Sequence, residues 1–200
     1  MGLLDVQRME AVLCIIRQDE FLLFGEQKRD FCKGLYTGFA GIHPRKEPYK
    51  RTINRILKSE VGLRAIEVEQ LGTIFFHGWK QKEPVDLIVH VFCCTKFTGI
   101  PQETDKMRPK WFSIYNVPYE KMYPHSKSWI PYLIEHERFQ GRVYYDVHGR
   151  MGDNVFSQVL YLINTPYSEF EDFKPKTDTY TCPTYVPESL YPPAREGEEF

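Results

Sequence analysis

A fixed set of spacings between residues 41 and 63 constrains this chain more than any other feature. Gly41 is followed by five residues and Glu47, and seven further residues lead to Arg55. Leu57 and Leu63 then stand where they can bury the inner side of a helix against a sheet, while glycine supplies backbone conformations that other residues resist. The spacing predicts a helix over about 47–61, bounded by glycines and packed on a sheet.

The pattern resembles the box of the Nudix hydrolases, G-x5-E-x7-R-E-U-x-E-E-x-G-U, where U is a bulky aliphatic residue. Seven of its nine specified positions match, and the two departures are Ile56 and Ser59, where the family has glutamates. In the family, the glutamates of this helix coordinate divalent cations that bridge the phosphates of a nucleotide. The vestigial box comprises Gly41, Glu47, Arg55, Ile56, Ser59, Glu60 and Gly62.

The two departures remove ligands and charge from the implied metal site. Mg²⁺ takes oxygen ligands and has little affinity for an aliphatic side chain such as that of Ile56. Residues 56 and 60 share one face of a helix, so that face offers an isoleucine and Glu60. A charge pair about 4 Å apart at an effective dielectric near 20 is worth on the order of 4 kcal/mol, so two lost charges weaken metal binding by orders of magnitude. We expect no metal, no cofactor and no catalytic residue.

Strand-like and helix-like segments alternate along the chain. They predict an α/β class, a Nudix-type α/β/α sandwich with a mixed sheet, rather than the regular βαβ units of a doubly wound sheet. The second expected helix covers Ser128–Glu137. The expected strands are Arg8–Ile16, Phe21–Phe24, Val68–Phe76, Val85–Phe97, Lys110–Ile114, Arg142–Val147 and Val155–Ile163.

Beyond the box, residues 10–164 resemble one Nudix branch, the MutT-homologue enzymes that hydrolyse oxidised purine nucleoside triphosphates. Residues 35–41 and 107–112 carry this likeness most closely. The resemblance implies base-reading polar residues at three positions, which here hold Thr37, His125 and Ser126, and a metal-binding glutamate at the position of Lys106. Where a base-reading residue is replaced by one with different donors and acceptors, hydrogen bonds to the base are not made, and each missing bond costs about 1–3 kcal/mol of binding free energy. The candidate nucleotide pocket comprises Phe31, Thr37, Lys106, Tyr123 and Trp129.

From residue 165 the composition changes to interleaved prolines and aromatic residues. Proline removes backbone donors and fixes φ, so this stretch predicts neither a helix nor a central strand. We expect a Nudix-like domain over 1–164 and an extended arm over 165–200 that docks on a partner protein. The residues expected to dock are Tyr167, Phe173, Tyr180, Tyr185 and Tyr191.

The preferred hypothesis is a catalytically inactive Nudix-fold protein that serves as a structural accessory subunit of a larger assembly. One alternative is a nucleotide sensor without hydrolysis, in which a basic cluster (Arg45, Lys46, Lys50 and Arg51) holds phosphates. Another is a weak or repurposed nucleoside di- or triphosphate hydrolase. His43 lacks carboxylate or cysteine neighbours in the sequence, which predicts an ordinary loop residue.

The net charge of −1 argues against broad attraction to nucleic acid, and no apolar stretch is long enough to predict a membrane span. We expect an intracellular protein, cytoplasmic or mitochondrial, with mitochondrial and cytoskeletal assemblies as the candidate partners by fold-level analogy. Cys93 and Cys94 are adjacent in a predicted strand, so their side chains should point to opposite faces as free thiols.

Overall fold

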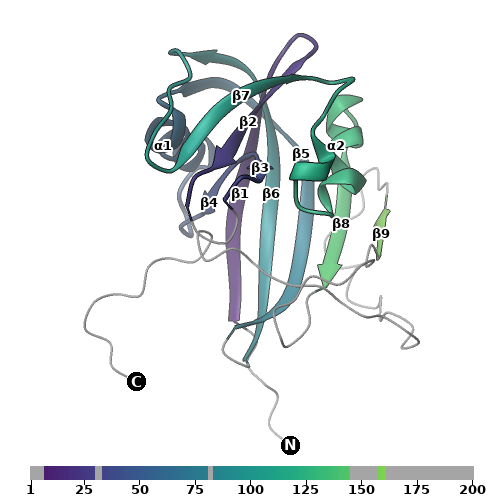
Figure 1. Ribbon diagram of the computed structural model, residues 1–200. Coiled ribbons are helices and arrows are strands. Elements are labelled where there is room, and N and C mark those ends of the chain that lie inside the picture. Colours follow the sequence, from purple (N-terminus) through teal and green to yellow (C-terminus); the bar gives the residue numbers. More distant parts are fainter. Residues whose placement is uncertain (1–6, 30–32, 81–82, 145–156, 161–200) are drawn as a thin grey trace, which may run out of the picture.

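The computed structural model describes residues 7–29, 33–80, 83–144 and 157–160 (Figure 1). In these residues one mixed sheet carries helices on both of its faces. The strands are β1 Gln7–Gln18, β2 Phe21–Gln27, β3 Tyr36–Thr37, β4 Phe39–Ile42, β5 Arg64–Lys80, β6 Glu83–Thr98, β7 Met107–Ser113, β8 Phe139–Tyr144 and β9 Ser157–Leu160. The helices are α1 Tyr49–Val61, the short 3-10 helix η1 Tyr119–Lys121 and α2 Ser126–Ile134.

The sheet order is β3-β2-β1-β6-β5-β8-β9, with β4 paired to β1 and β7 paired to β2. Two pairings are parallel, β1 with β6 and β5 with β8, and the rest are antiparallel. The expected mixed sheet is confirmed. Long β5 and β6 form an antiparallel pair that runs the length of the molecule, and β1 lies beside β6 (Figure 1).

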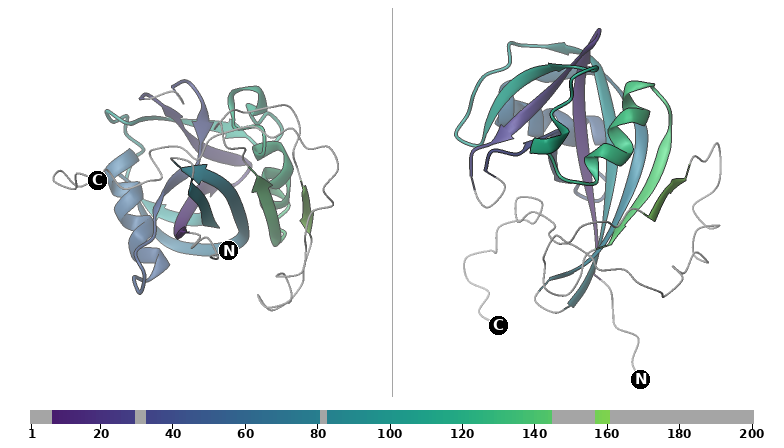
Figure 2. Two further views of the ribbon diagram at one scale, coloured as in Figure 1. Left: turned by 90° about the horizontal axis from the view of Figure 1, so that it is seen from below. Right: turned by 45° about the vertical axis from the view of Figure 1, so that its right-hand side comes forward.

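Alternation along β1 divides the interior into two cores. Ala11 and Ile15 belong to a core shared with α2, whereas Val12, Cys14 and Ile16 belong to a core shared with α1. Successive strand side chains point to opposite faces, so one strand contributes to both layers. The views in Figure 2 place α1 and α2 on opposite sides of the sheet. The α/β/α sandwich is therefore confirmed.

Helix α1 forms where apolar residues recur three or four positions apart, and its buried residues are Thr52, Ile53, Ile56, Leu57 and Val61. Pro48 precedes it without a side-chain cap. Gly62 ends it in the left-handed conformation, with φ 74°. A residue with a Cβ is disfavoured at such an angle, which is why a glycine ends the helix here.

The structure corrects several expected boundaries. Helix α1 begins at Tyr49 rather than near residue 47, because Pro48 occupies the N-cap. Helix α2 begins two residues earlier than expected and ends at Ile134. Strands β3 and β4 were not expected, because they contain two and four residues and such short strands leave no measurable periodicity.

The thiols of Cys14, Cys93 and Cys94 are free and buried, and the last two belong to opposite cores, as expected. Among the described residues, no helix is long and apolar enough to cross a membrane. Phe31 and the whole expected arm over 165–200 lie outside the described residues. The division into a domain over 1–164 and an arm stays a prediction.

Candidate functional site

Glu47 organises the loop between β4 and α1. Its carboxylate accepts a hydrogen bond from the Thr52 hydroxyl, and its Oε2 lies 3.4 Å from Nη2 of Arg55. Arg51 Nε lies 3.6 Å from the other oxygen. The hydrogen bond from Thr52, together with the hydrogen bond and charge of Arg55 and the charge of Arg51, lowers the pKa of Glu47 below its usual range. The ion pair between Glu47 and Arg55 that the family resemblance implies is present.

His43 is not the ordinary loop residue that its sequence neighbours predicted. It is 8% exposed, its Nδ1 lies 2.9 Å from Thr52 Oγ1, and its ring packs on that of Tyr49 with centroids 4.3 Å apart. Because the Thr52 proton goes to Glu47, the Nδ1 atom of His43 is the donor to Thr52. His43, Thr52 and Glu47 thus form one chain of hydrogen bonds that fixes the loop to the helix.

A second polar cluster beside the start of α1 was also missed. Tyr49 Oη lies 3.2 Å from Nε2 of His90, and the same nitrogen lies 3.6 Å from a carboxylate oxygen of Glu10. Burial lowers the pKa of His90, and the Glu10 carboxylate opposes this effect. These residues come from β1, β6 and α1, so no local spacing in the sequence could have grouped them.

Ile56 fills the position where the family has its first helical glutamate. The residue is 5% exposed and belongs to the α1-side core. A Cβ added to Gly41 would lie 2.9 Å from Ile56 Cδ1, closer than non-bonded carbons approach. We expected Gly41 to be needed for an unusual backbone conformation, but it lies within β4, and its requirement is space for the isoleucine.

Ser59 offers no replacement for the second lost carboxylate. The residue is exposed, and its hydroxyl donates to the carbonyl oxygen of Ile56 at 3.0 Å, the usual bond of a helical serine to its own preceding turn. A hydroxyl used in this way is a poor ligand for a divalent cation.

Glu60 is the carboxylate that remains at this end of α1. Its Oε2 is buried and has no hydrogen-bond partner among the described residues. Burial raises the pKa of Glu60 to about 8, against the smaller opposing effect of the Lys106 charge. At neutral pH the group is therefore mostly the uncharged acid.

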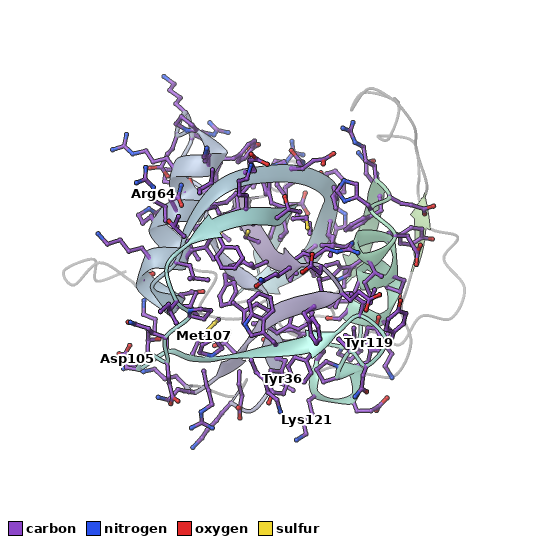
Figure 3. All side chains as sticks on the ribbon, turned by 90° about the horizontal axis from the view of Figure 1, so that it is seen from above. Tyr36, Arg64, Asp105, Met107, Tyr119 and Lys121 are labelled. Carbon is purple, nitrogen blue, oxygen red and sulfur yellow. The ribbon has the colours of Figure 1, made fainter. Side chains whose placement is uncertain are left out.

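The loop before β7 closes over this part of α1. Thr104 Oγ1 donates to the backbone oxygen of Glu60 at 2.9 Å, and exposed Lys106 lies between Asp105 and Met107, which Figure 3 labels near α1. The structure thus places Lys106 near Glu60, whose carboxyl group feels its charge. A lysine brings a positive charge to the place where the resemblance implies a metal-binding glutamate.

The residues present do not fit the divalent cations that the family resemblance implies. The side chain at position 56 is apolar and buried. The hydroxyl of Ser59 already donates a hydrogen bond to the helix backbone, and Glu60 is mostly protonated. Within the described ranges no group of three or more His, Cys, Asp or Glu side chains could hold a metal ion.

The implied base-reading positions have a different chemistry as well. Trp129 Nε1 donates to Nδ1 of His125 at 3.3 Å, and the His125 ring stacks on Tyr123 at 5.6 Å and packs edge-on against Phe76 at 5.2 Å. Burial of the ring lowers the pKa of His125 to about 4, so it is neutral at physiological pH. Ser126 is 5% exposed, which leaves little of it for a ligand.

Of the candidate nucleotide pocket, the structure describes four residues, since Phe31 lies outside the described residues. Trp129 is 5% exposed and stacks on Phe139 with centroids 5.9 Å apart, so it belongs to the core. Thr37 is a partly exposed residue of β3, and Lys106 lies beside α1. Tyr123 and Trp129 both contact His125, one of the changed base-reading positions.

Comparison with known proteins agrees with this architecture. The chain is 30% identical over 147 residues to an oxidized purine nucleoside triphosphate hydrolase from Danio rerio, an alignment that covers 74% of this chain and 93% of the relative. It is 31% identical over 129 residues to the protein of the same name from Mus musculus, covering 64% of this chain and 81% of that protein. No protein-family model matches the chain.

Solved structures show the same fold. A mutator MutT protein from Bacillus halodurans superposes with a TM-score of 0.60 at 17% identity, over 70% of this chain and 92% of that one. A MutT protein from Methanosarcina mazei gives a TM-score of 0.54 at 14% identity, over 66% and 96% of the two chains. Together with the sequence relatives, the sandwich fold and the retained frame of the box, they show that this chain belongs to the MutT-type branch of the Nudix hydrolase superfamily.

Proposed function

We propose that this protein is a Nudix-fold pseudoenzyme that acts as a structural accessory subunit of a protein assembly. The observation that carries the proposal is the packing of Ile56 against Gly41, which places an aliphatic side chain at a metal-ligand position. Ser59, protonated Glu60 and Lys106 support it, because each lowers the affinity of the site for a divalent cation.

The base-reading side supports the same proposal. A neutral histidine whose Nδ1 already accepts a bond inside the protein offers the edge of a purine one N–H donor, in place of the acceptor oxygens of the aspartate that the family resemblance implies at this position. His125 accepts from Trp129 and is covered by two aromatic rings. The replaced metal ligands and the replaced base-reading residues are separate changes, and either change alone would lower the rate of nucleotide hydrolysis.

A weak or repurposed hydrolase is the second candidate, and the relatives named as hydrolases favour it. The decisive experiment measures pyrophosphate and phosphate release from normal and oxidised purine nucleoside triphosphates with Mg²⁺ or Mn²⁺. The wild type and Glu60→Gln should both stay at the background rate. Turnover in the wild type that Glu60→Gln abolishes would establish a hydrolase and overturn the proposal.

Calorimetry distinguishes a structural subunit from a protein that binds nucleotides without hydrolysing them. In EDTA, titration of nucleoside di- and triphosphates into the protein should give only heats of dilution. Saturable heat that disappears when Lys50 and Arg51 are replaced by Gln would instead identify a nucleotide sensor.

The accessory role is tested on the residues that we expect to dock. We propose that the arm over 165–200 fastens the domain to its partners, through aromatic residues such as Tyr180, Tyr185 and Tyr191. Native purification of the full chain should bring down stoichiometric partner chains, and replacement of these three tyrosines by Ser should release them. Partners that stay bound to the substituted chain would contradict a docking role for the arm.

A further inference from the structure

Seven exposed basic residues lie on and beside α1, and we refer to them as the cationic face. The stretch that carries them, residues 43–64, contains two carboxylates. Glu60 has a buried Oε2, and Glu47 is shared by Arg51 and Arg55. Among the described residues, these two arginines are the members of the face that have an ion-pair partner. The cationic face comprises Arg45, Lys46, Lys50, Arg51, Arg55, Lys58 and Arg64.

Helix α1 presents this charge on its outer side. Arg51, Arg55 and Lys58 are separated by four and then three residues, so they follow one line along the helix over about 10 Å. The opposite side of the helix is buried against the sheet. Figure 2 shows α1 at the edge of the molecule, with no other described element on its outer side. The charge is therefore accessible to a partner.

This charge does not stabilise the helix that carries it. The positive end of a helix dipole favours acidic residues in the first turn, but α1 has none there and instead begins with Lys50 and Arg51. Its N-cap, Pro48, provides no side-chain bond. The like charges of Arg51 and Arg55, one turn apart, also repel each other. Positions that break a local rule without a local gain are where a binding role is expected.

The composition of the cationic face indicates the chemical class of the partner. Apart from Pro44 and Pro48, the exposed residues of 43–64 include no apolar or aromatic side chain. Single-stranded nucleic acids are bound by stacking of their bases on aromatic rings, and amphipathic helices bind membranes by inserting an apolar face. The apolar face of α1 is already used in the core. What remains exposed is charge alone.

The size of the cationic face favours a short partner segment. Helix α1 has 13 residues and is about 20 Å long. Exposed carboxylates bound the face, because Glu67 and Glu69 follow Arg64 on β5, and Asp105 lies in the loop that closes over the end of α1. The whole chain has a net charge of −1. A nucleic-acid duplex or a membrane surface would extend over these carboxylates, whereas a short acidic segment meets the cations alone.

We propose that the cationic face binds an acidic segment of a partner protein, whose carboxylates are spaced to meet Arg51, Arg55 and Lys58. A helix with carboxylates at positions i, i+4 and i+7 has this spacing, and arginine bonds a carboxylate through two parallel N–H groups. The inference rests on the proposed accessory function, because it names one surface through which the domain joins an assembly. It does not depend on whether the site hydrolyses nucleotides.

Binding of four labelled probes to the full chain tests the class of partner. The first is a helical alanine peptide with glutamates at i, i+4 and i+7, and the second has the same composition with its glutamates distributed around the helix. The others are an oligouridylate and vesicles of phosphatidylcholine and phosphatidylserine. The first peptide should bind most tightly, and its affinity should fall as the salt concentration rises. Equal affinity for the two peptides, or tighter binding of the oligouridylate or the vesicles, would overturn the proposal.

A charge-reversed variant tests whether the cationic face is the binding surface. We choose three members of the face that have no ion-pair partner among the described residues, so that their replacement leaves the fold intact. The Kd for the first peptide should rise about tenfold or more, and the melting temperature should stay unchanged. The variant is Lys50→Glu/Lys58→Glu/Arg64→Glu.

A second variant with the same change in net charge is the matched control. It replaces three exposed basic residues outside the face and should bind the first peptide as the wild type does. An equal loss of affinity in both variants would show that net charge, rather than the face, attracts the peptide, and would contradict the proposal. The control variant is Arg8→Glu/Lys33→Glu/Lys121→Glu.

Carbodiimide cross-linking of natively purified protein locates the partner on the face. This reagent joins a lysine to a carboxylate with which it is in contact, and the pair of Lys96 with Glu67, 2.6 Å apart, is the internal positive control. Links from Lys46, Lys50 or Lys58 to carboxylates of a co-purifying chain are expected. Formation of the control link without any link from the face, or links from the face to a second copy of this chain, would refute the proposal.

The same purification separates failure of this inference from failure of the accessory function. The charge-reversed chain should lose a partner chain that the wild type and the control variant retain. If every partner stays bound to the charge-reversed chain, the face has no docking role and the accessory function still holds. If no partner co-purifies with the wild type, the accessory function itself is wrong.

Discussion

The two sides of α1 differ in what they retain from the Nudix box. On the side that faces the sheet, Ile53, Leu57 and Val61 are fully buried, and the helix ends at the expected glycine. On the side that faces β4 and the loop before β7, the box has an isoleucine, a serine and a protonated glutamate, and Lys106 lies near the glutamate. The comparison shows that the fold and the chemistry of this motif depend on different residues.

The physical reason lies in what holds a helix in place. Most helical stability in a folded protein comes from burying an amphipathic face, and the metal-binding carboxylates do not contribute to that burial. Clustered carboxylates repel one another unless a cation is present. Replacing one of them by a well-packed isoleucine removes that repulsion and adds apolar contact, so loss of the chemistry is compatible with a stable fold.

Substitutions on the sheet-facing side should have the largest effect. Leu57→Ala removes a fully buried side chain from the α1-side core and should lower the free energy of unfolding by about 3 kcal/mol. Urea denaturation with an unchanged m-value measures this. Lys58→Ala, on the exposed side of the same turn, is the matched control and should stay within about 0.5 kcal/mol of the wild type. Equal losses in the two variants would contradict the division of α1 into two sides.

Glu60→Gln tests the protonation state on the loop-facing side. The pKa of Glu60 is about 8 in the folded protein and near 4.5 when unfolded, so the folded state binds more protons between these values. Wild-type stability should therefore fall as pH rises from about 4.5 to about 8.

The glutamine variant cannot ionise and should not show this part of the decline. Near pH 4, below both pKa values, the two proteins should be equally stable. At pH 9 the variant should be more stable by about 2 kcal/mol, a value reduced from the full linkage energy because the side chain is partly exposed. Denaturation curves at several pH values measure the difference. Parallel profiles would show that Glu60 is ionised in the folded protein, as a metal ligand would be.

Gly62→Ala tests why α1 ends where it does. With φ at 74° and no neighbouring atom nearer than 3.6 Å to an added Cβ, the strain is conformational rather than steric. Alanine should cost about 1 kcal/mol, and Asn, which tolerates this conformation better, should cost less. Thermal melts of both variants distinguish the two causes, because a steric clash would make Asn the worse substitution.

Arg55→Gln should have the smallest effect. Its ion pair with Glu47 is 3.4 Å long, and the arginine side chain is 55% exposed. Such surface pairs contribute about 0.5 kcal/mol or less, and Glu47 keeps its bond from Thr52. A double-mutant cycle with Glu47→Gln measures the coupling. A coupling energy well above 1 kcal/mol would mean that the motif's ion pair helps to hold α1 in place.

The long elements could be predicted from the sequence, but the short ones could not. Alternation over many residues located β5 and β6, and the 3.6-residue period located α1. Strands β3 and β4 derive from pairing with β2 and β1, which is tertiary information. The start of α1 moved because Pro48 occupies the N-cap, and its end stayed where Gly62 predicted it.

The site divides in the same way. The missing carboxylates at 56 and 59 followed directly from spacing, because ligand chemistry depends on residue type. The bonds of His43 to Thr52 and of Tyr49 to His90 join segments that only the fold brings together. We expected a glycine at position 41 for its backbone conformation. The structure shows instead that the Ile56 side chain occupies the space that a Cβ at position 41 would need.

A Mn²⁺ titration followed by electron paramagnetic resonance tests the central claim most directly. It compares the wild type, Glu60→Gln and the triple variant Ile56→Glu/Ser59→Glu/Lys106→Glu, which supplies the carboxylates that the family resemblance implies. The wild type and Glu60→Gln should leave the same amount of Mn²⁺ free, whereas the triple variant should bind it and still hydrolyse nucleotides poorly, because the base-reading positions remain changed. Saturable Mn²⁺ binding by the wild type that Glu60→Gln abolishes would contradict the account.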